Sequence, residues 1–246
     1  MKTLVAIPTF NEAENIAPLL DRIFECAPDL DVVVIDDASK DGTAAIVESK
    51  AAGSKSGKIN IIKRSGKLGL GTAYLRAFEW AMQNNYDAVI EMDADFSHNP
   101  TELPKIISAL KVDPVVVCSR YIEGGGTENW SLLRQLISRC GTLYTRIILG
   151  LTCSDATGGF NGWRTEVLRS IDLGGITSEG YAFQIELKYR SWLMGYNLKE
   201  LPIHFVDRRA GQSKMSYMIV VEAVFKVWQL RFSPIKRTLS EKKKSL

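Results

Sequence analysis

Two aspartates, Asp93 and Asp95, stand one residue apart directly after the largely apolar stretch 89–92. Alternate side chains of an extended strand point the same way, so a buried strand ending here would deliver both carboxylates together at its carboxyl end. Two like charges this close repel each other unless a positive group lies between them, and a hard divalent cation with oxygen ligands is the usual solution. The alternative is a capped turn in which Asp95 opens the helix expected from Pro100. The local sequence leaves both interpretations open.

Apolar runs and helical periodicity alternate along the first 120 residues. A short apolar run bounded by turn residues is typical of a buried strand, and apolar residues three and four apart are typical of a helix. The expected strands are 4–8, 31–37, 59–62, 87–92 and 115–119; the expected helices are 11–24, 43–51, 72–84 and 100–111, with a surface loop at 52–57. This alternation predicts an α/β fold with a largely parallel, doubly wound sheet.

Polar or charged residues follow four of these five strands. The carboxyl ends of parallel strands meet at one edge of a sheet, where open α/β sheets bind their ligands. We therefore expect Asp37 after the second strand, Asp93 and Asp95 after the fourth, and Arg120 after the fifth to lie close together. Their convergence favours a binding site over a set of scattered structural side chains.

Length and composition limit the class of protein. The chain has 246 residues, 46% hydrophobic and 24% charged, which suits one large α/β domain or two small ones. A net charge of +3 gives no electrostatic case for binding nucleic acid. The four cysteines lack metal-ligand spacing, so free thiols are expected. With no secretory signal and no run of 18 apolar residues, the chain is not expected to span a membrane by itself.

Several common chemistries lack their motifs. The glycines of 66–71 do not have the order of a dinucleotide-binding loop, and neither an NTPase phosphate loop nor a serine nucleophile elbow is present. What remains is Asp37, suited to the donors of a base or ribose, beside an aspartate pair suited to a cation on a diphosphate. The combination indicates a nucleotide-diphosphate site with bound metal. For Asp37 alone, an Asx turn is the alternative role.

Four cations are candidates for binding phosphate: Arg120, Arg134, Arg208 and Lys214. A guanidinium group binds phosphate oxygens in pairs, and lysine adds a compact charge. These residues could hold a second phosphate or neutralise a leaving diphosphate. The alternative role for an isolated arginine is a surface ion pair.

The second half of the chain is less regular. Residues 123–129 are expected to be flexible, and 155–162 to form a Gly-rich turn region. The further expected elements are helices at 132–149, 181–195 and 216–232 and a strand at 201–206. We expect one catalytic-type domain over 1–232, followed by a basic, mobile tail over 233–246.

The motifs, taken in their order, resemble those of family 2 glycosyltransferases with the GT-A fold, specifically the dolichyl- or polyprenyl-phosphate mannosyltransferases. The matching segments are Pro-Thr-Phe-Asn-Glu at 8–12, Ile-Asp-Asp at 35–37, Met-Asp-Ala-Asp-Phe-Ser-His at 92–98, Ser-Arg-Tyr at 119–121, Asn129-Trp130 with Arg134, and 207–214. The resemblance covers residues 3–232. The ordered set is far more specific than any single motif.

This resemblance implies GDP-mannose as donor, the phosphate of dolichyl or polyprenyl phosphate as acceptor, and Mg²⁺ or Mn²⁺ as cofactor. It assigns the nucleoside pocket to Pro8, Phe10, Glu12, Ile35 and Asp37. It assigns the diphosphate and metal to Asp93, Ala94 and Asp95, with Ser97 as a further candidate ligand, and has Arg208 and Lys214 close over the donor. It assigns the acceptor phosphate to Arg120, Arg134 and Ser138. Asp95, Arg120 and Arg208 are the residues expected to act directly in catalysis.

Three features depart from the family pattern. Phe10 stands where the family usually has Tyr, which keeps stacking but loses a hydroxyl. Ser97 stands at a position that is Gln in some relatives, where that side chain reaches the metal. The C-terminal transmembrane helices of some members are missing, so lipid access is expected through the helix 216–232, the basic tail or a partner subunit. We accordingly expect a cytoplasmic enzyme, peripheral at the cytoplasmic face of a membrane.

The implied reaction needs no catalytic base. A lipid phosphate is already anionic at neutral pH, so the protein has only to align it and to stabilise the departing GDP. A single in-line displacement would convert an α-linked donor into a β-linked product. Glycosylation of a hydroxyl would instead need a carboxylate base, for which Asp155 and Glu186 are the candidates. The alternatives are the same acceptor with UDP-glucose or UDP-N-acetylglucosamine as donor, or a nucleotide-sugar-binding subunit without turnover.

Overall fold

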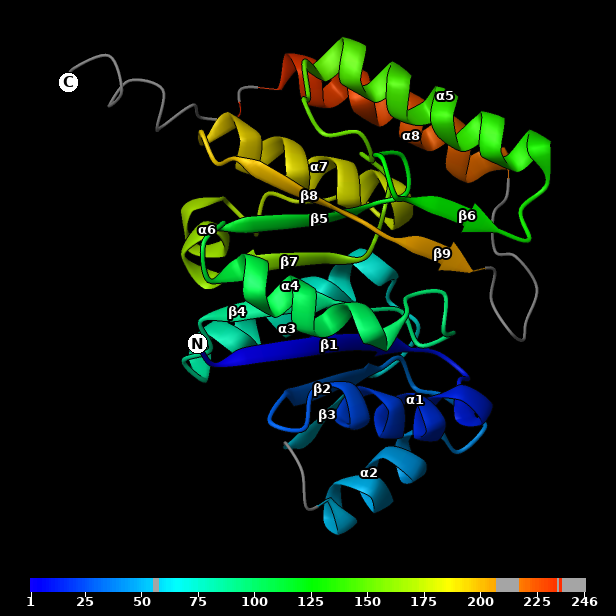
Figure 1. Ribbon diagram of the computed structural model, residues 1–246, viewed down its shortest axis with the longest axis vertical. Helices are drawn as coiled ribbons and strands as arrows, with labels where there is room; N and C mark the ends of the chain where they lie inside the picture. The colour runs from blue at the N-terminus through cyan, green and yellow to red at the C-terminus, as the bar shows by residue number, and fades with distance from the viewer. Residues whose placement is uncertain (55–57, 207–216, 234, 236–246) are drawn as a thin grey trace.

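The structure, a computed structural model, describes residues 1–54, 58–206, 217–233 and 235. A seven-stranded sheet in the order β3-β2-β1-β4-β7-β5-β8 forms its centre (Figure 1). The strands are β1 (Thr3–Thr9), β2 (Asp31–Asp36), β3 (Ile59–Lys63), β4 (Ala88–Glu91), β5 (Val115–Ser119), β7 (Asn161–Arg164) and β8 (Leu198–Pro202). Neighbours are parallel except that β7 runs antiparallel to both β4 and β5. The predicted fold with a largely parallel sheet is confirmed.

The strands are apolar because helices cover both faces of the sheet. Alternate residues of one strand enter opposite cores: Leu4 and Ala6 of β1 pack into one, and Val5 and Ile7 into the other. The helices α1 (Ala13–Cys26), α2 (Thr43–Gly53) and α4 (Leu103–Leu110), the last preceded by the 3-10 turn η1 (Pro100–Glu102), pack on the face of Val5. The helices α3 (Leu70–Gln83), α6 (Thr165–Ser170) and α7 (Gly180–Leu193) pack on the face of Leu4.

A further layer lies beyond the β8 end of the sheet. There α5 (Leu132–Leu149) and α8 (Tyr217–Phe232) run side by side, and α8 also contacts α7 (Figure 1). A small parallel sheet of β6 (Gly126–Glu128) and β9 (His204–Val206) lies beneath them. This layer forms one wall of the site described below.

The structure corrects the expected elements in the second half of the chain. The segment 123–129, expected to be flexible, contains β6, and the predicted strand 201–206 is divided between β8 and β9, which belong to different sheets. The Gly-rich region 155–162 leads into β7, which the sequence did not predict. Asn-Gly-Trp-Arg has no apolar run or alternation, so only its pairing with β4 and β5 makes it a strand.

Gly162 of β7 offers a test of packing between the sheet and α4. A Cβ atom here would lie 2.8 Å from Leu110 Cδ1 and 3.0 Å from Ile106 Cγ2, two buried side chains. We predict that Gly162→Ala lowers the free energy of unfolding by about 1–3 kcal/mol, as overpacking does. The control is Gly141→Ala on α5, where a Cβ meets nothing within 4 Å; alanine should there stabilise by about 0.5–1 kcal/mol. Urea unfolding measures both, and equal effects would contradict the packing described.

Candidate active site

A cleft of about 330 Å³ opens at the carboxyl ends of β1, β2, β4 and β5. Its floor carries Asp93, Ala94 and Asp95, which follow β4. The segment after β1 and the start of α3 form one wall, and Arg120, Trp130 and the turn 157–159 form the other. Asp37, Asp93, Asp95 and Arg120 thus line one cleft, and the structure adds residues of the second half of the chain that the strand ends did not predict.

Asp93 and Asp95 lie in a turn beyond β4, because that strand ends at Glu91. The Tyr74 hydroxyl donates to Asp93 Oδ1 at 3.2 Å, and the Ser97 amide donates to Asp95 Oδ1 at 3.1 Å. Asp95 does not open the following helix; Asn99 does so by accepting from the Thr101 amide. The aspartates are thus held at the cleft by their own turn and by Tyr74 of α3.

The donor set of this turn suits a hard cation. Ser97 is 3% exposed, and its Oγ has no hydrogen-bond partner among the described residues. Such an orphaned buried oxygen, beside two carboxylates, matches the all-oxygen ligands of Mg²⁺ or Mn²⁺. The described part of the chain holds no group of three or more His, Cys, Asp or Glu side chains that could hold a metal.

His98 belongs to this turn, and the sequence analysis missed it. Its Nδ1 accepts a hydrogen bond from the Asp93 amide at 3.0 Å, and its ring stacks on Phe160 at 4.7 Å between centroids. Burial lowers the pKa of His98 below its ordinary value. The ring is therefore neutral, with its proton on Nε2, which lies 3.9 Å from Asp93 Oδ2. His98 lines the cleft as a hydrogen-bond donor. Its place at the end of the matching segment 92–98 was the sequence signal that could have found it.

The wall after β1 carries the residues expected to hold a nucleoside. Pro8, Phe10, Glu12 and Asp37 line the cleft, and the Lys67 ammonium lies 4.6 Å from the centre of the Phe10 ring. The Phe10 side chain is partly buried, and its ring suits stacking against a base. We expect a bound base to displace Lys67 from that ring.

Ile35 does not reach the cleft, which corrects its predicted place in the nucleoside pocket. It is fully buried and packs in the core beneath α3, because it points to the same face of β2 as Val33.

Asp37 is tied to a residue that the sequence analysis did not single out. Its carboxylate forms a buried ion pair with Arg64 and accepts the Leu68 amide at 3.1 Å. Arg64 also donates to the Gly69 carbonyl at 2.9 Å. The pair fixes the loop between β3 and α3 against the end of β2. Asp37 thus has a structural role beside the predicted one.

The opposite wall holds Arg120, which is 6% exposed and paired with the fully buried Asp155. Arg120 Nε donates to Asp155 Oδ2 at 2.6 Å, and Nη2 donates to Oδ1 at 2.7 Å. Asp155 therefore has no freedom to act as a base. Glu186, the other carboxylate considered, is buried in an ion pair with Arg190 at 2.7 Å.

The remaining predicted residues of this wall differ in their positions. Arg134 lines the cleft, with its guanidinium 4.0 Å from the centre of the Trp130 ring. Ser138 lies beyond the cleft and accepts from the Tyr121 hydroxyl at 2.6 Å. The predicted residues Arg208 and Lys214 lie outside the described residues.

A narrow apolar slot continues from the cleft between α5, α7 and α8. It shares Arg120, Trp130 and Arg134 with the cleft and extends past Ser138 to Val227. The slot has a volume of about 90 Å³. A ligand with a charged head and an apolar chain would fit this succession of surfaces.

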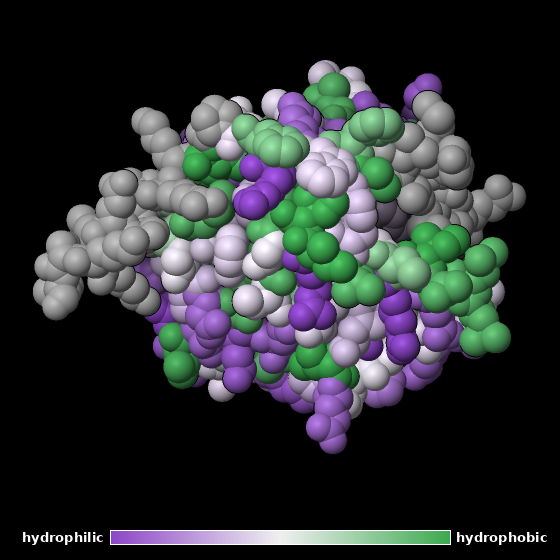
Figure 2. All heavy atoms as spheres, turned by 90° about the horizontal axis from the view of Figure 1, so that it is seen from above, coloured by the Kyte–Doolittle hydropathy of each residue, from purple (hydrophilic) through white to green (hydrophobic). Residues whose placement is uncertain are grey.

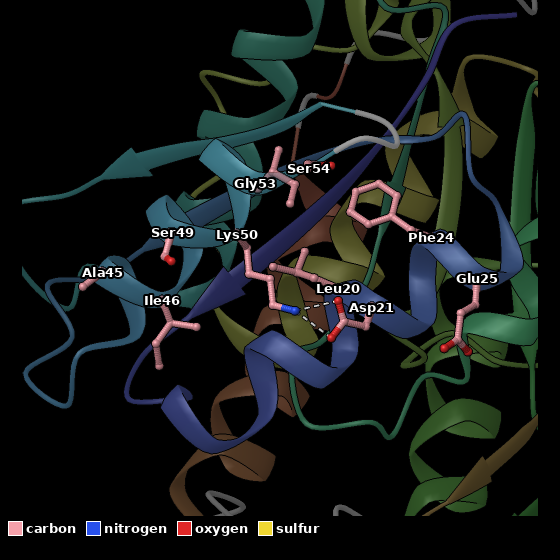
Figure 3. Close-up of a pocket in the computed structure, with 11 residues that line it drawn as sticks. Leu20, Asp21, Phe24, Glu25, Ala45, Ile46, Ser49, Lys50, Gly53 and Ser54 are labelled. Atoms are coloured by element: carbon pink, nitrogen blue, oxygen red, sulfur yellow. Dashed lines mark hydrogen bonds and ion pairs between the residues drawn. The ribbon is translucent and has the colours of Figure 1, made fainter.

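A larger groove of about 850 Å³ lies elsewhere, between α1 and α2 (Figure 3). It is crossed by the exposed ion pair between Lys50 and Asp21, 2.6 Å apart. None of the strand ends with the predicted site residues reaches it. We therefore place the site in the smaller cleft.

The mostly parallel sheet, with a cleft at the carboxyl ends of its strands, has the GT-A fold of glycosyltransferases. The model of glycosyl transferase family 2 matches residues 4–172. The chain is 43% identical over 227 residues to an undecaprenyl-phosphate mannosyltransferase of Micrococcus luteus, covering 92% of this chain and 93% of that one. It is 40% identical over 233 residues to the polyprenol monophosphomannose synthase of Mycolicibacterium smegmatis, covering 94% and 88%.

Solved structures of lower identity share the fold. Glucosyl-3-phosphoglycerate synthase of Mycobacterium tuberculosis, in complex with Mn²⁺ and UDP, has a TM-score of 0.68 at 17% identity, covering 95% of this chain and 81% of that one. A mannosyltransferase of Pyrobaculum calidifontis, in complex with GDP-mannose and Mn²⁺, has a TM-score of 0.56 at 16% identity, covering 99% and 79%. The chain belongs to glycosyl transferase family 2 and is a glycosyltransferase. The alternative of a subunit without turnover is set aside.

The buried pair of Arg64 and Asp37 gives a test of the donor wall. Their side chains are 8% and 9% exposed, so removing one partner leaves an uncompensated buried charge. We predict that Arg64→Met lowers the free energy of unfolding by about 3–5 kcal/mol. The matched control is Arg22→Met, which breaks the exposed pair with Glu25 and should cost under about 1 kcal/mol. Denaturant unfolding would contradict this description if both variants lost the same stability.

Proposed function

We propose that the protein transfers mannose from GDP-mannose to the phosphate of a polyprenyl phosphate, with a divalent metal and inversion at the sugar. The observation that carries this proposal is the continuous path from the aspartate turn, past Arg120 and Arg134, into the apolar slot. A nucleotide-sugar donor suits the first part of this path, and a phosphate bearing an apolar chain suits the second. The undecaprenyl-phosphate mannosyltransferase, 43% identical, and the polyprenol monophosphomannose synthase, 40% identical, support the same acceptor by their names.

The charges of the site fit an acceptor that is itself a phosphate. Asp155 and Glu186 are both held in buried ion pairs, which leaves neither as a base for a sugar hydroxyl. A phosphate monoester needs none, because it is anionic at neutral pH. The role left to Arg120 and Arg134 is to hold that anion beside the donor sugar.

The donor side fits a nucleoside diphosphate. Phe10 offers a ring face for the base, and Asp93, Asp95 and Ser97 would hold the metal. When bound, Mg²⁺ or Mn²⁺ supplies positive charge that stabilises the departing diphosphate. His98 Nε2–H adds a neutral donor beside the same oxygens. Because the acceptor enters from the opposite wall, a single in-line displacement gives a β-linked product.

The identity of the nucleotide is the first part of the proposal to test. Structures of this fold hold either UDP or GDP-mannose, so the fold alone does not choose between them. We expect a panel of GDP-mannose, UDP-glucose and UDP-N-acetylglucosamine, each incubated with a polyprenyl phosphate, to give lipid-linked sugar from GDP-mannose. Lipid-linked product from the UDP-sugars alone would overturn the assignment of the donor.

The metal role of the aspartate turn can be tested both by turnover and by metal binding without turnover. We predict that Asp95→Asn lowers kcat on the order of 10²–10³-fold, the effect of losing one group that stabilises developing charge. It should also abolish Mn²⁺ binding to the GDP complex, as measured by titration calorimetry. Asp29→Asn, at an exposed position, is the control and should change neither quantity. Unchanged Mn²⁺ affinity in the Asp95 variant would contradict the assignment.

Contact with a membrane would bring the lipid to the slot. No helix in the described part of the chain is long and apolar enough to cross a bilayer. The outer face of α5 nevertheless exposes Leu132, Leu133, Leu136 and Ile147 at 59–84% of their surface. The helix carries Arg134, Arg139 and Arg146 and no acidic residue. Figure 2 shows this mixed hydrophobic and hydrophilic face from above.

The helix 216–232, predicted to meet the membrane, adds exposed Phe225 and Phe232. Most of the basic tail lies outside the described residues.

We therefore expect α5 to hold the protein at an anionic bilayer. The triple variant Leu132→Ser, Leu133→Ser, Leu136→Ser should reduce co-flotation with phosphatidylglycerol vesicles by about tenfold, because each exposed leucine loses apolar surface for burial. Val112→Ser, which alters a residue 80% exposed on another side of the domain, should have no effect. Equal flotation of the triple variant and the unaltered protein would remove α5 from this role.

A further inference from the structure

A lysine with no place in the proposed reaction is buried behind the cleft. Lys188 of α7 is fully buried, and burial lowers its pKa below the ordinary value. Its ammonium group donates to the backbone carbonyls of Asp155 at 3.1 Å, Ala156 at 3.2 Å and Gly158 at 2.7 Å. An ammonium group has three N–H donors, so all of them hold one turn of the chain. That turn contains Asp155 and forms part of the cleft wall.

The turn held by Lys188 binds the Arg120 guanidinium. Besides the two side-chain bonds already described, Asp155 accepts the Arg120 backbone amide at 3.1 Å and the Gly158 amide at 3.0 Å. Thr157, also in the turn, accepts from Arg120 Nη2 at 3.0 Å. Burial by itself would raise the pKa of Asp155, but the Arg120 charge and hydrogen bonds bring it below its ordinary value. Asp155 is therefore a carboxylate throughout the neutral range.

These bonds leave one edge of Arg120 for a substrate. Of the five N–H donors of a guanidinium group, the one on Nε and both on Nη2 are bound to Asp155 and Thr157. The structure gives Nη1 no hydrogen-bond partner among the described residues, although Arg120 lines both the cleft and the slot. The rings of Tyr121 and Trp130 lie 5.2 and 5.3 Å from its central carbon and limit tilting of the plane. The side chain is thereby fixed with two donors to spare.

We propose that Asp155 and Lys188 are positioning residues that act through Arg120. Lys188 sets the shape of the turn 155–158, and the turn fixes the guanidinium plane so that its Nη1 edge receives the acceptor phosphate. A rigid guanidinium binds an anion with little loss of side-chain freedom, and the bound geometry is ready for attack. This inference rests on the proposed role of Arg120 in holding the acceptor.

Separate kinetic constants for the two substrates test this inference. Asp155→Asn places an amide N–H against the donors of Arg120, and Lys188→Met removes all three bonds to the turn. Each should raise the KM for a short-chain polyprenyl phosphate about tenfold or more, the loss expected from one misplaced charge-assisted hydrogen bond. The KM for GDP-mannose and the affinity for GDP should stay within about twofold, because the donor wall is separate.

The matched control lies on the same helix. Glu186→Gln breaks the ion pair between Glu186 and Arg190. The two side chains are 2% and 10% exposed, and neither residue lines the cleft. This variant should lower the melting temperature without separating the two KM values. Thr157→Val leaves every buried charge paired, so it replaces Asp155→Asn or Lys188→Met as the test if either of those variants does not fold. It should raise the KM for polyprenyl phosphate alone, by a smaller factor than the charge variants do.

Coupling to Arg120 separates positioning from a general structural role. If Asp155 acts through Arg120, then Asp155→Asn should cause no further loss of polyprenyl-phosphate affinity in an Arg120→Met background. Additive losses, or parallel increases in both KM values for Asp155→Asn, Lys188→Met and Thr157→Val, would overturn the inference. An unchanged acceptor KM in Arg120→Met alone would instead refute the proposed role of Arg120 itself.

Discussion

The buried ion pair between Arg120 and Asp155 is the contact on which the arrangement of the site depends. It joins the end of β5 to the turn before β7, and thus connects the regular first half of the chain to its irregular second half. A charge removed from water needs a partner, and Arg120 and Asp155 provide one for each other. Further hydrogen bonds run from Arg120 to Thr157, and to Asp155 from the backbone amides of Arg120 and Gly158. On the opposite wall, the buried ion pair of Asp37 and Arg64 likewise joins two segments, the end of β2 and the loop before α3. The cleft is therefore bounded on both sides by charges that cannot move freely.

Between these fixed walls lies the aspartate turn after β4. It is held through its own backbone, His98 and the Tyr74 hydroxyl. Two carboxylates this close together favour a hard cation between them. The walls differ in a corresponding way: one offers a ring and a carboxylate for a nucleoside, and the other offers arginines that lead into an apolar slot. This asymmetry is what the proposed transfer between a nucleotide-sugar and a lipid phosphate requires.

The first half of the fold could be predicted from sequence because its signals are local. Apolar runs such as Val32–Ile35, buried on both faces, and helices with clear periodicity fixed the parallel sheet, and the polar strand ends located the cleft. The partners within the site could not be predicted, because Arg64, His98 and Lys188 acquire their roles from residues distant in sequence or from burial that no local pattern encodes. The strand β7 is of the same kind: its residues pair with β4, which lies 70–76 residues earlier in the chain, and with β5, which lies 44–48 residues earlier. The predicted place of Ile35 in the nucleoside pocket was wrong, because its nearness to Asp37 in the sequence did not indicate which face of β2 its side chain occupies.

The central claim is that the acceptor phosphate attacks the sugar directly, without a protein base or a covalent intermediate. Product analysis with ¹⁸O-labelled polyprenyl phosphate and unlabelled GDP-mannose tests it most directly. The account predicts a β-linked mannosyl phosphate that retains all of the ¹⁸O, with none in the released GDP. An α-linked product, or ¹⁸O transferred to GDP, would contradict it.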